Sequence, residues 1–242
     1  MCTVSYIPQK GDENSFILTS NRDERVERPT LYPEIYKINN LSLCYPKDLK
    51  AGGSWIAVND KGRLTCLLNG AHHLHEKKVH HTHSRGKVLL DIAASEEDPL
   101  FFFSYYDLSR TEPFTIITLD SHKRKALHFT EFIWDGNKKY LKELDPSQPH
   151  IWSSVTLYSK EKRIQKQEKF KAFLSKQDDV ITFDEVFSFH SGKEEESEAN
   201  DFLLETEMGL KTVSITQVIR MDGEFRIKYL DLIGNEIHLN SL

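Results

Sequence analysis

The sequence predicts an α+β protein in which antiparallel sheets are covered by helices. Two observations lead to this prediction. Short runs of alternating apolar and polar residues, typical of half-buried strands, recur along the chain and are joined by turns that contain glycine. The segments of helical composition are grouped between these hairpins, a pattern that disfavours alternating βαβ units and a parallel sheet. The chain is expected to form a single domain, 1–242, because no linker rich in proline or glycine and no internal repeat divides it.

Two hairpins are expected in the first part of the chain. Residues 2–7 alternate as a strand does, and residues 15–20 (SFILTS) form its partner after a polar turn. The second hairpin joins 54–59 to 63–68 through a short turn that ends at Gly62. The first hairpin would bring the polar string that follows residue 20 close to the start of the chain.

Two helices are expected between the hairpins. Ser84 is a candidate N-cap for a helix that continues to Ala93, and Pro99 would end or kink this helix. Residues 160–176 have a strongly helical composition. Their apolar residues are expected to form a buried stripe, made of Ile164, Phe170, Phe173 and Leu174. The lysines and arginines of this helix are expected to form a solvated face rather than a binding patch.

The remaining segments follow the same hairpin pattern. Strands are expected at 114–119, 126–131, 212–220 and 224–232, with a turn at Gly234-Asn235 after the last of them. The acidic run at 193–198 is expected to be a solvated loop or the start of a helix.

Composition and charge exclude several classes of protein. The formal net charge of −5 gives no electrostatic reason to bind a polyanion, so nucleic acid is not an expected partner. No apolar stretch approaches the roughly 20 residues of a membrane-spanning helix, and the first residues lack the features of a signal peptide. A cytoplasmic location is expected. The three cysteines, Cys2, Cys44 and Cys66, do not form a regular disulfide framework.

Cys2 is the candidate nucleophile. Removal of Met1 would give residue 2 both a thiol and a free α-amine, which titrate near 8.5 and 7.7–8.0 in model peptides. The amine could take the thiol proton directly or through one water, so a single residue would supply the attacking group and its base. A cysteine in this position is also compatible with an ordinary small buried residue.

Several short motifs after Cys2 resemble one known family. They are the N-R-D-E string Asn21-Arg22-Asp23-Glu24, then Arg28-Pro29, Gly52-Gly53-Ser54-Trp55, Lys61-Gly62-Arg63-Leu64 before Asn69, and Ser84-Arg85-Gly86. The chain resembles the NRDE family, also called the transport-and-Golgi-organisation family, most closely over residues 1–90. The resemblance implies an N-terminal nucleophile hydrolase fold, a four-layer αββα sandwich of two antiparallel sheets between helices. It also implies distant similarity to cysteine amidases that cleave linear C–N amide bonds.

The resemblance implies roles for individual residues. Cys2 would be the nucleophile, Arg22 and Asp23 would tune its thiol and amine, and Asn69 would donate a hydrogen bond to the oxyanion. A guanidinium near the thiol favours the thiolate. The candidate binding residues are Asn21, Glu24, Trp55, Arg85 and Lys211.

Structural alternatives stay open for these residues. Arg22 and Asp23 could form a salt-bridged turn, Glu24 could support the backbone or Arg28, and Asn69 could begin a turn with Gly70. Gly52 and Gly53 suit a tight turn before a strand, and Trp55 suits the core or a pocket wall.

Two departures from the family pattern weaken the case for catalysis. Ser153 and Ser154 follow Trp152 where relatives have a Leu-Ser-Asn run, so an asparagine that positions the nucleophile is missing. Lys211 stands in a Met-Gly-Leu-Lys run where the family tends toward arginine, and it lacks the rigid fork of that side chain.

Function therefore has two candidate classes. The first is a hydrolase of linear amide bonds that acts on a small molecule and requires no cofactor. The second is a non-catalytic binding or trafficking protein on the same scaffold, which would carry heme, a lipid or an acyl-CoA. The histidines between His72 and His83 are interpreted as a solvated loop, with metal or heme contact as the alternative.

Overall fold

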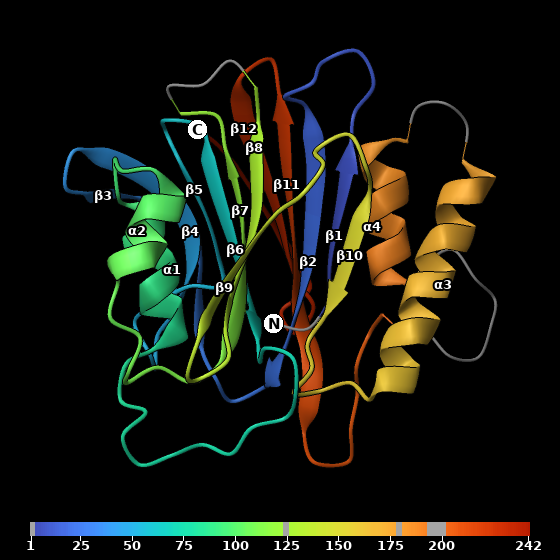
Figure 1. Cartoon of the computed structure of the whole chain (residues 1–242). Coiled ribbons are helices and arrows are strands. Elements are labelled where there is room, and N and C mark those ends of the chain that lie inside the picture. Colours follow the sequence, from blue (N-terminus) through green and yellow to red (C-terminus); the bar gives the residue numbers. More distant parts are fainter. Residues whose placement is uncertain (1–2, 123–125, 178–180, 193–201) are drawn as a thin grey trace. The chain divides into compact units, whose positions relative to one another are not determined.

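The computed structural model describes residues 3–122, 126–177, 181–192 and 202–242 (Figure 1). These residues divide into two compact units. The first unit combines both ends of the chain, Met1–Arg28 and Ser147–Ser241, and the second contains Pro29–Pro146. Each unit contains one sheet, in which all strands pair antiparallel, and two helices. The predicted α+β class is therefore confirmed.

The sheet of the first unit has the strand order β10-β1-β2-β11-β12-β13. Its strands are β1 (Thr3–Pro8), β2 (Phe16–Arg25), β10 (His150–Ser153), β11 (Leu210–Met221), β12 (Glu224–Asp231) and β13 (Glu236–Ser241). Helices α3 (Lys160–Lys176) and α4 (Phe183–Ser191) lie beside this sheet in Figure 1. One apolar cluster joins the sheet to both helices; it contains Ile7, Ile17, Phe170, Phe173 and Val186.

The N-R-D-E string lies inside β2 rather than after it. The strand continues from Phe16 to Arg25 because β11 pairs with it as far as Arg25. Side chains alternate along a strand, so Asn21 and Asp23 share the face of Ile17, which packs against the helices. Arg22 is on the opposite face. The alternative of a turn at Arg22 and Asp23 is therefore wrong.

Helix α3 has the predicted bounds but a different buried face. Phe170 and Phe173 are buried and Leu174 is partly buried, whereas Ile164 is 43% exposed. Lys166 is only 1% exposed, so the expectation that all basic residues of this helix are solvated is wrong. The acidic run at 193–198 lies outside the described residues.

The sheet of the second unit has the strand order β3-β4-β5-β6-β7-β8-β9. Its strands are β3 (Thr30–Ile38), β4 (Leu41–Asp48), β5 (Ile56–Asn59), β6 (Arg63–Asn69), β7 (Phe114–Asp120), β8 (His128–Trp134) and β9 (Lys139–Glu143). Helix α1 (Arg85–Ala93) packs on β5 and β6. Pro99 starts a second helix, α2 (Pro99–Tyr105), instead of merely ending the first, because Asp98 caps it and proline suits its first turn.

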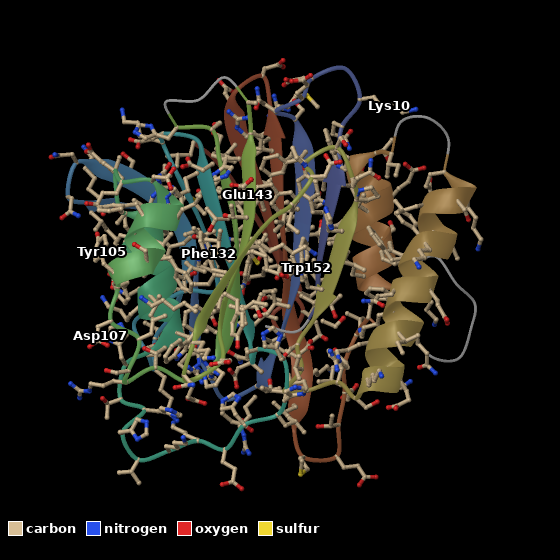
Figure 2. The ribbon with its side chains drawn as sticks, viewed as in Figure 1. Lys10, Tyr105, Asp107, Phe132, Glu143 and Trp152 are labelled. Carbon is tan, nitrogen blue, oxygen red and sulfur yellow. The ribbon has the colours of Figure 1, made fainter. Side chains whose placement is uncertain are left out.

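The core of the second unit lies between its sheet and its helices. The rings of Phe103 on α2 and Phe132 on β8 are 4.7 Å apart, and Figure 2 labels Phe132 within this unit. Leu89, Ile92 and Phe114 belong to the same cluster and are fully buried. None of the helices in the described part of the chain combines the length and the apolar character needed to cross a membrane.

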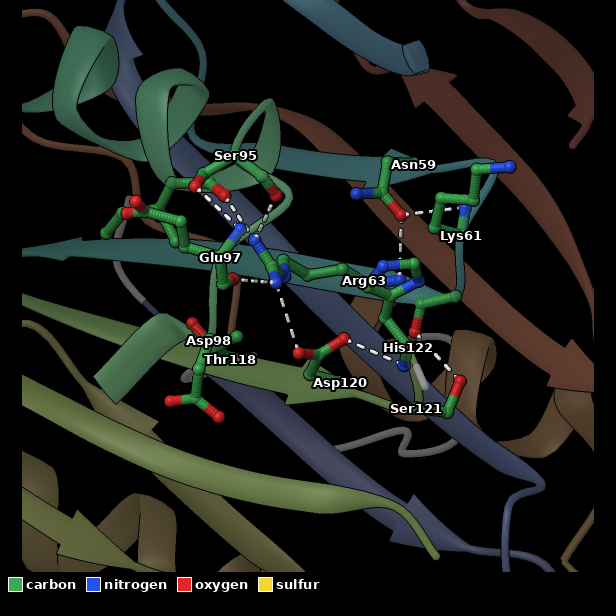
Figure 3. Close-up of polar contacts among 12 residues, drawn as sticks. Asn59, Lys61, Arg63, Ser95, Glu97, Asp98, Thr118, Asp120, Ser121 and His122 are labelled. Carbon is green, nitrogen blue, oxygen red and sulfur yellow. Dashed lines mark hydrogen bonds and ion pairs between the residues drawn. The ribbon is translucent and has the colours of Figure 1, made fainter. Parts of the chain in front are cut away.

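Helix α1 is fixed at both ends by residues of the sequence motifs. At its start, the amide of Ser54 donates to the carbonyl of Gly86 over 3.2 Å. At its end, the buried guanidinium of Arg63 donates to the carbonyls of Ile92 and Ser95 and to Asp120 (Figure 3). Since the last carbonyls of a helix have no partner within it, this side chain caps α1. The Lys61-Gly62-Arg63-Leu64 motif thus has a structural role.

Candidate functional site

The N-R-D-E segment of β2 lies beside a β-bulge. Asp23 pairs with Thr212 and Arg22 pairs with Ser214, so Val213 is an extra residue on β11 at the step between them. Bulges interrupt the regular ladder and redirect neighbouring side chains, and they are frequent next to functional sites. Asn21, Arg22 and Asp23 are all buried, at 0%, 3% and 3% exposure. This part of the sheet therefore contains an unusual concentration of buried polar groups.

The carboxylate of Asp23 is held by two hydroxyl groups. Tyr158, which precedes α3, donates to Oδ2 over 2.8 Å, and Thr212 donates to Oδ1 over 2.5 Å. The Thr212 hydroxyl also accepts from the amide of Leu204, which leaves its hydrogen for Asp23. Both oxygens of the buried carboxylate consequently have a fixed direction.

Asn21 belongs to a buried network with Ser5 and His190. The Asn21 amide nitrogen donates to the carbonyls of His190 and Phe202 over 3.2 and 2.7 Å. Its oxygen must then face His190 Nδ1, 2.7 Å away, so Nδ1 carries the hydrogen. The Ser5 hydroxyl lies 2.7 Å from His190 Nε2 and donates to it. Ser5, His190 and Asn21 are thus arranged like a nucleophile, its base and the residue that orients the base. However, Ser5 and His190 are both 0% exposed.

A buried cation lies close to this network. Lys166 Nζ is 4.3 Å from the ring centroid of Tyr158 and 4.5 Å from that of Phe202. Such contacts with ring faces partly replace the hydration of an ammonium group. Burial lowers the pKa of His190 to about 3, and the positive charge of Lys166 contributes to the decrease. His190 is therefore neutral at physiological pH.

Arg22 lies on the face of the sheet opposite the helices. Val4 of β1 and Tyr229 of β12 are on the same face by strand alternation. Burial raises the pKa of the Tyr229 hydroxyl, while its neighbour Ser214 and the positive charge of Arg22 oppose this increase. The guanidinium is therefore close enough to Tyr229 to act on it electrostatically.

Two other candidate residues of the first unit lie in ion pairs. Glu24 contacts Arg28 over 3.4 Å and accepts from the amide of Arg25, as the structural alternative for Glu24 expected. Lys211 pairs with Glu205 over 3.2 Å, and its side chain is 41% exposed. These contacts satisfy both charges at the partly exposed end of the β2–β11 pair.

Three candidate residues lie in the second unit. Asn69 is the last residue of β6 and pairs with Phe114, and Gly70 follows it with a positive φ of 86°. Trp55 is buried just before β5. Arg85 opens α1, donates to the carbonyl of Pro113 over 3.4 Å and lies 3.6 Å from Glu112.

The predicted nucleophile, Cys2, lies outside the described residues. The next residue, Thr3, pairs with Asn21 of β2 on one side and with Ser153 of β10 on the other. Ser154 is buried and lies 2.9 Å from the Thr156 hydroxyl. Ser153 is thus paired with the third residue of the chain. Its strand, β10, contains no asparagine.

The histidines of 72–83 have separate neighbours. The ring of His72 packs against Tyr140, His75 lies 3.4 Å from Glu112, and His83 lies 3.1 Å from the Tyr106 hydroxyl. Within the described ranges, no three residues of the metal-binding types are grouped to hold an ion. His72, His75 and His83 therefore have different partners, while the rings of His80 and His81 lie 4.6 Å apart.

Sequence reasoning missed four residues that define this site: Tyr158, Lys166, His190 and Thr212. Thr212 opens an expected strand, 212–220, but the sequence does not show that this strand pairs with the N-R-D-E string. Lys166 occupies the same face of α3 as Phe170 and Phe173, at spacings of four and seven, which places it on the buried stripe. No comparable signal identifies His190 or Tyr158.

Solved structures of N-terminal nucleophile hydrolases share this fold. A variant of the conjugated bile acid hydrolase from Clostridium perfringens matches 99% of this chain and 92% of its own, with a TM-score of 0.60 and 10% identity. Penicillin V acylase from Agrobacterium tumefaciens matches 100% of this chain and 86% of its own, with a TM-score of 0.57 and 8% identity. The chain therefore has an N-terminal nucleophile hydrolase fold, as expected from the resemblance.

The sequence also identifies the family. The family described as Transport and Golgi organisation 2 matches residues 1–225, and the chain belongs to this family. The Transport and Golgi organization protein 2 homolog of Bos taurus is 28% identical over 108 residues, and its counterpart in Homo sapiens is 27% identical over 108 residues. Each match covers 42% of this chain but only 38% of the relative, well under half of its length.

Proposed function

We propose that the chain is an N-terminal cysteine hydrolase that cleaves linear amide bonds of small molecules. After removal of Met1, Cys2 would be the nucleophile and its α-amine the base. The observation that carries this proposal is that Arg22 and Asp23 are buried on β2. They directly follow Asn21, the residue of β2 that pairs with Thr3. Successive Cα atoms are only about 3.8 Å apart across a trans peptide, so residue 2 is close to Thr3.

Arg22 would favour the thiolate form of Cys2. We propose that Arg22, which is buried on the same face of the sheet as Val4 of β1, acts on the Cys2 thiol. A guanidinium close to a thiol lowers the thiol pKa and increases the fraction of thiolate. Asp23, with both oxygens fixed by hydroxyl groups, would orient the α-amine from the other face.

The reaction would proceed in two steps. The thiol sulfur attacks the amide carbonyl carbon, and its proton passes through the α-amine to the leaving nitrogen as the C–N bond breaks. Water then attacks the thioester and regenerates the thiol with release of a carboxylic acid. The role of Asn69 as oxyanion donor stays a prediction from the family resemblance.

The mass of the purified protein and the alkylation of Cys2 test this proposal together. The intact mass should correspond to a chain that begins at Cys2. Iodoacetamide should modify the Cys2 peptide at pH 7 roughly tenfold faster than a free cysteine with a pKa near 8.5. Cys44 and Cys66 should not interfere, because they are 2% and 0% exposed and burial raises the pKa of Cys44 to about 12.

Two arginine variants supply the matched control. Arg22→Met should slow alkylation of Cys2, whereas Arg25→Met, at an exposed position of the same strand, should not. Release of amines from a panel of N-acyl substrates should be lost in Cys2→Ala. Retention of Met1, or a Cys2 thiol no more reactive than free cysteine, would overturn the proposal.

The family description concerns transport, which supports a binding protein on the same scaffold as the second candidate. Such a protein would be stabilised by its ligand without turning it over. Thermal unfolding in the presence of hemin and of acyl-CoA distinguishes this outcome from hydrolysis of the amide panel.

A further inference from the structure

Lys166 is a buried cation that the proposed reaction does not use. It lies on α3, 1% exposed, with its Nζ near the faces of Tyr158 and Phe202. Burial of an ammonium group is costly unless charged or polarisable groups compensate for the lost water. A leucine or methionine would fill the same space without this cost, so the charge itself has a role.

Tyr158 connects this cation to Asp23. Its ring faces Lys166 Nζ, while its hydroxyl donates to Asp23 Oδ2 over 2.8 Å. A nearby positive charge makes a phenol a stronger hydrogen-bond donor, because it stabilises negative charge that develops on the phenol oxygen. The ammonium, the phenol and the carboxylate therefore form a continuous path from α3 to β2.

We propose that Tyr158 and Lys166 are positioning residues for the reaction at Cys2, acting through Asp23. Tyr158 fixes the direction of the carboxylate, and Lys166 strengthens the hydrogen bond from Tyr158. This inference rests on the proposed function, because it assigns to Asp23 the task of orienting the α-amine.

The two hydroxyl groups that hold Asp23 both come from outside its own strand. Thr212 holds Oδ1 from the neighbouring strand, where the bulge at Val213 shifts the register. Without the Tyr158 hydroxyl, which comes from the segment before α3, Oδ2 would lose this hydrogen bond, and the carboxylate could rotate. A rotated carboxylate would no longer hold the amine in the direction needed to accept the thiol proton.

A double-mutant cycle tests whether Tyr158 acts through Asp23. The measured quantity is the rate of alkylation of the Cys2 peptide by iodoacetamide, in the full chain, with thermal unfolding recorded for each variant. Tyr158→Phe keeps the ring and should slow alkylation roughly tenfold, the effect of one hydrogen bond to a charged group. In an Asp23→Asn background the same substitution should change the rate less than about twofold.

Substitutions of Lys166 test the role of the charge. Lys166→Met retains the length and apolar packing of the side chain and should slow alkylation about threefold, a smaller effect than that of Tyr158→Phe. Lys166→Arg restores a cation over the rings and should recover most of the rate. Equal alkylation rates in the Lys166→Met and Lys166→Arg variants would overturn the role of the charge.

Tyr140→Phe is the matched control, because Tyr140 also donates to a carboxylate, Asp135, over 2.9 Å in the second unit. It should leave alkylation unchanged. Independent, additive effects of Tyr158→Phe and Asp23→Asn would overturn this inference while the proposed function stands. A wild-type Cys2 without enhanced reactivity would instead overturn the proposed function, and this inference with it.

Discussion

The backbones of Gly53 and Gly86 are in direct contact. A Cβ atom on Gly53 would lie 2.5 Å from the carbonyl carbon of Gly86, and a Cβ on Gly86 would lie 2.7 Å from the carbonyl oxygen of Ser54. The motifs Gly52-Gly53-Ser54-Trp55 and Ser84-Arg85-Gly86 therefore form one packing contact, which brings α1 against the segment before β5. Because the two motifs are far apart in the sequence, the sequence alone does not predict this contact.

Alanine at position 53 should destabilise the second unit. The new methyl group would overlap backbone atoms that cannot rotate away, so we expect Gly53→Ala to cost about 3 kcal/mol. Gly223→Ala is the control, since the space around Gly223 is open and only its φ of 82° opposes a side chain. That variant should cost about 1 kcal/mol. Urea unfolding measures both, and equal losses would contradict the contact.

Replacement of Arg63 should also destabilise the second unit. Arg63→Met would remove the ion-pair partner of the buried Asp120 carboxylate and one donor to the carbonyls at the end of α1, at a cost of about 3–5 kcal/mol. Adding Asp120→Asn should recover part of this loss, since no buried charge then stays uncompensated. Urea unfolding again measures both. Arg110→Met, at an exposed arginine, should change the midpoint little; a similar loss there would contradict the interpretation.

Asn21→Asp tests the structural role of the first residue of the N-R-D-E string. The substitution keeps the shape but replaces a donor of two hydrogen bonds with an anionic oxygen that faces the carbonyls of His190 and Phe202. We expect a loss of about 3 kcal/mol in unfolding free energy of the first unit. Asn137→Asp, in an exposed turn, should be nearly neutral in the same denaturation experiment. A stable Asn21→Asp variant would show that the network is dispensable.

His190 should make the first unit less stable in acid. Its pKa is lowered from 6.5 to about 3 in the folded chain, so between these values the unfolded state binds more protons. Stability from this group is complete above pH 6.5 and is lost progressively as the pH falls toward 3, at up to about 1.4 kcal/mol per pH unit. Chemical denaturation from pH 7 to 4 should show a flatter dependence in His190→Asn than in wild type. The exposed His73→Asn should retain the wild-type slope, and parallel curves for all three would refute this assignment.

Local patterns predicted much of the fold. The bounds of α3, the hairpins around Gly62 and Gly223, and the antiparallel class follow from periodicity and turn residues, which act over a few positions. The hairpin of β3 and β4 was missed because Pro33 and Pro46 interrupt strands that tolerate them, with β3 at the sheet edge. Helix α4 was missed although Thr182 and Glu185 form a capping box at its start.

The candidate site was less predictable than the fold. The motif located Asn21, Arg22 and Asp23. It did not show that Arg22 lies on the opposite face of the sheet from Asn21 and Asp23, because this follows only from the extension of β2 to Arg25. The contacts to Tyr158 and His190 span 135 and 169 residues of sequence. No local pattern encodes such pairs, because they depend on how the last third of the chain pairs with the first hairpin.

The strand order of the first sheet has a consequence for synthesis on the ribosome. The β1–β2 hairpin lies between β10 and β11, so its partners emerge only after the whole of Pro29–Pro146 has been translated. At 5–20 residues per second, this delay is on the order of ten seconds. During that interval the second unit, whose strands are consecutive in sequence, can fold on its own. The hairpin, with its buried polar string, must meanwhile be kept from aggregating, which makes nascent chains of this protein candidates for chaperone assistance.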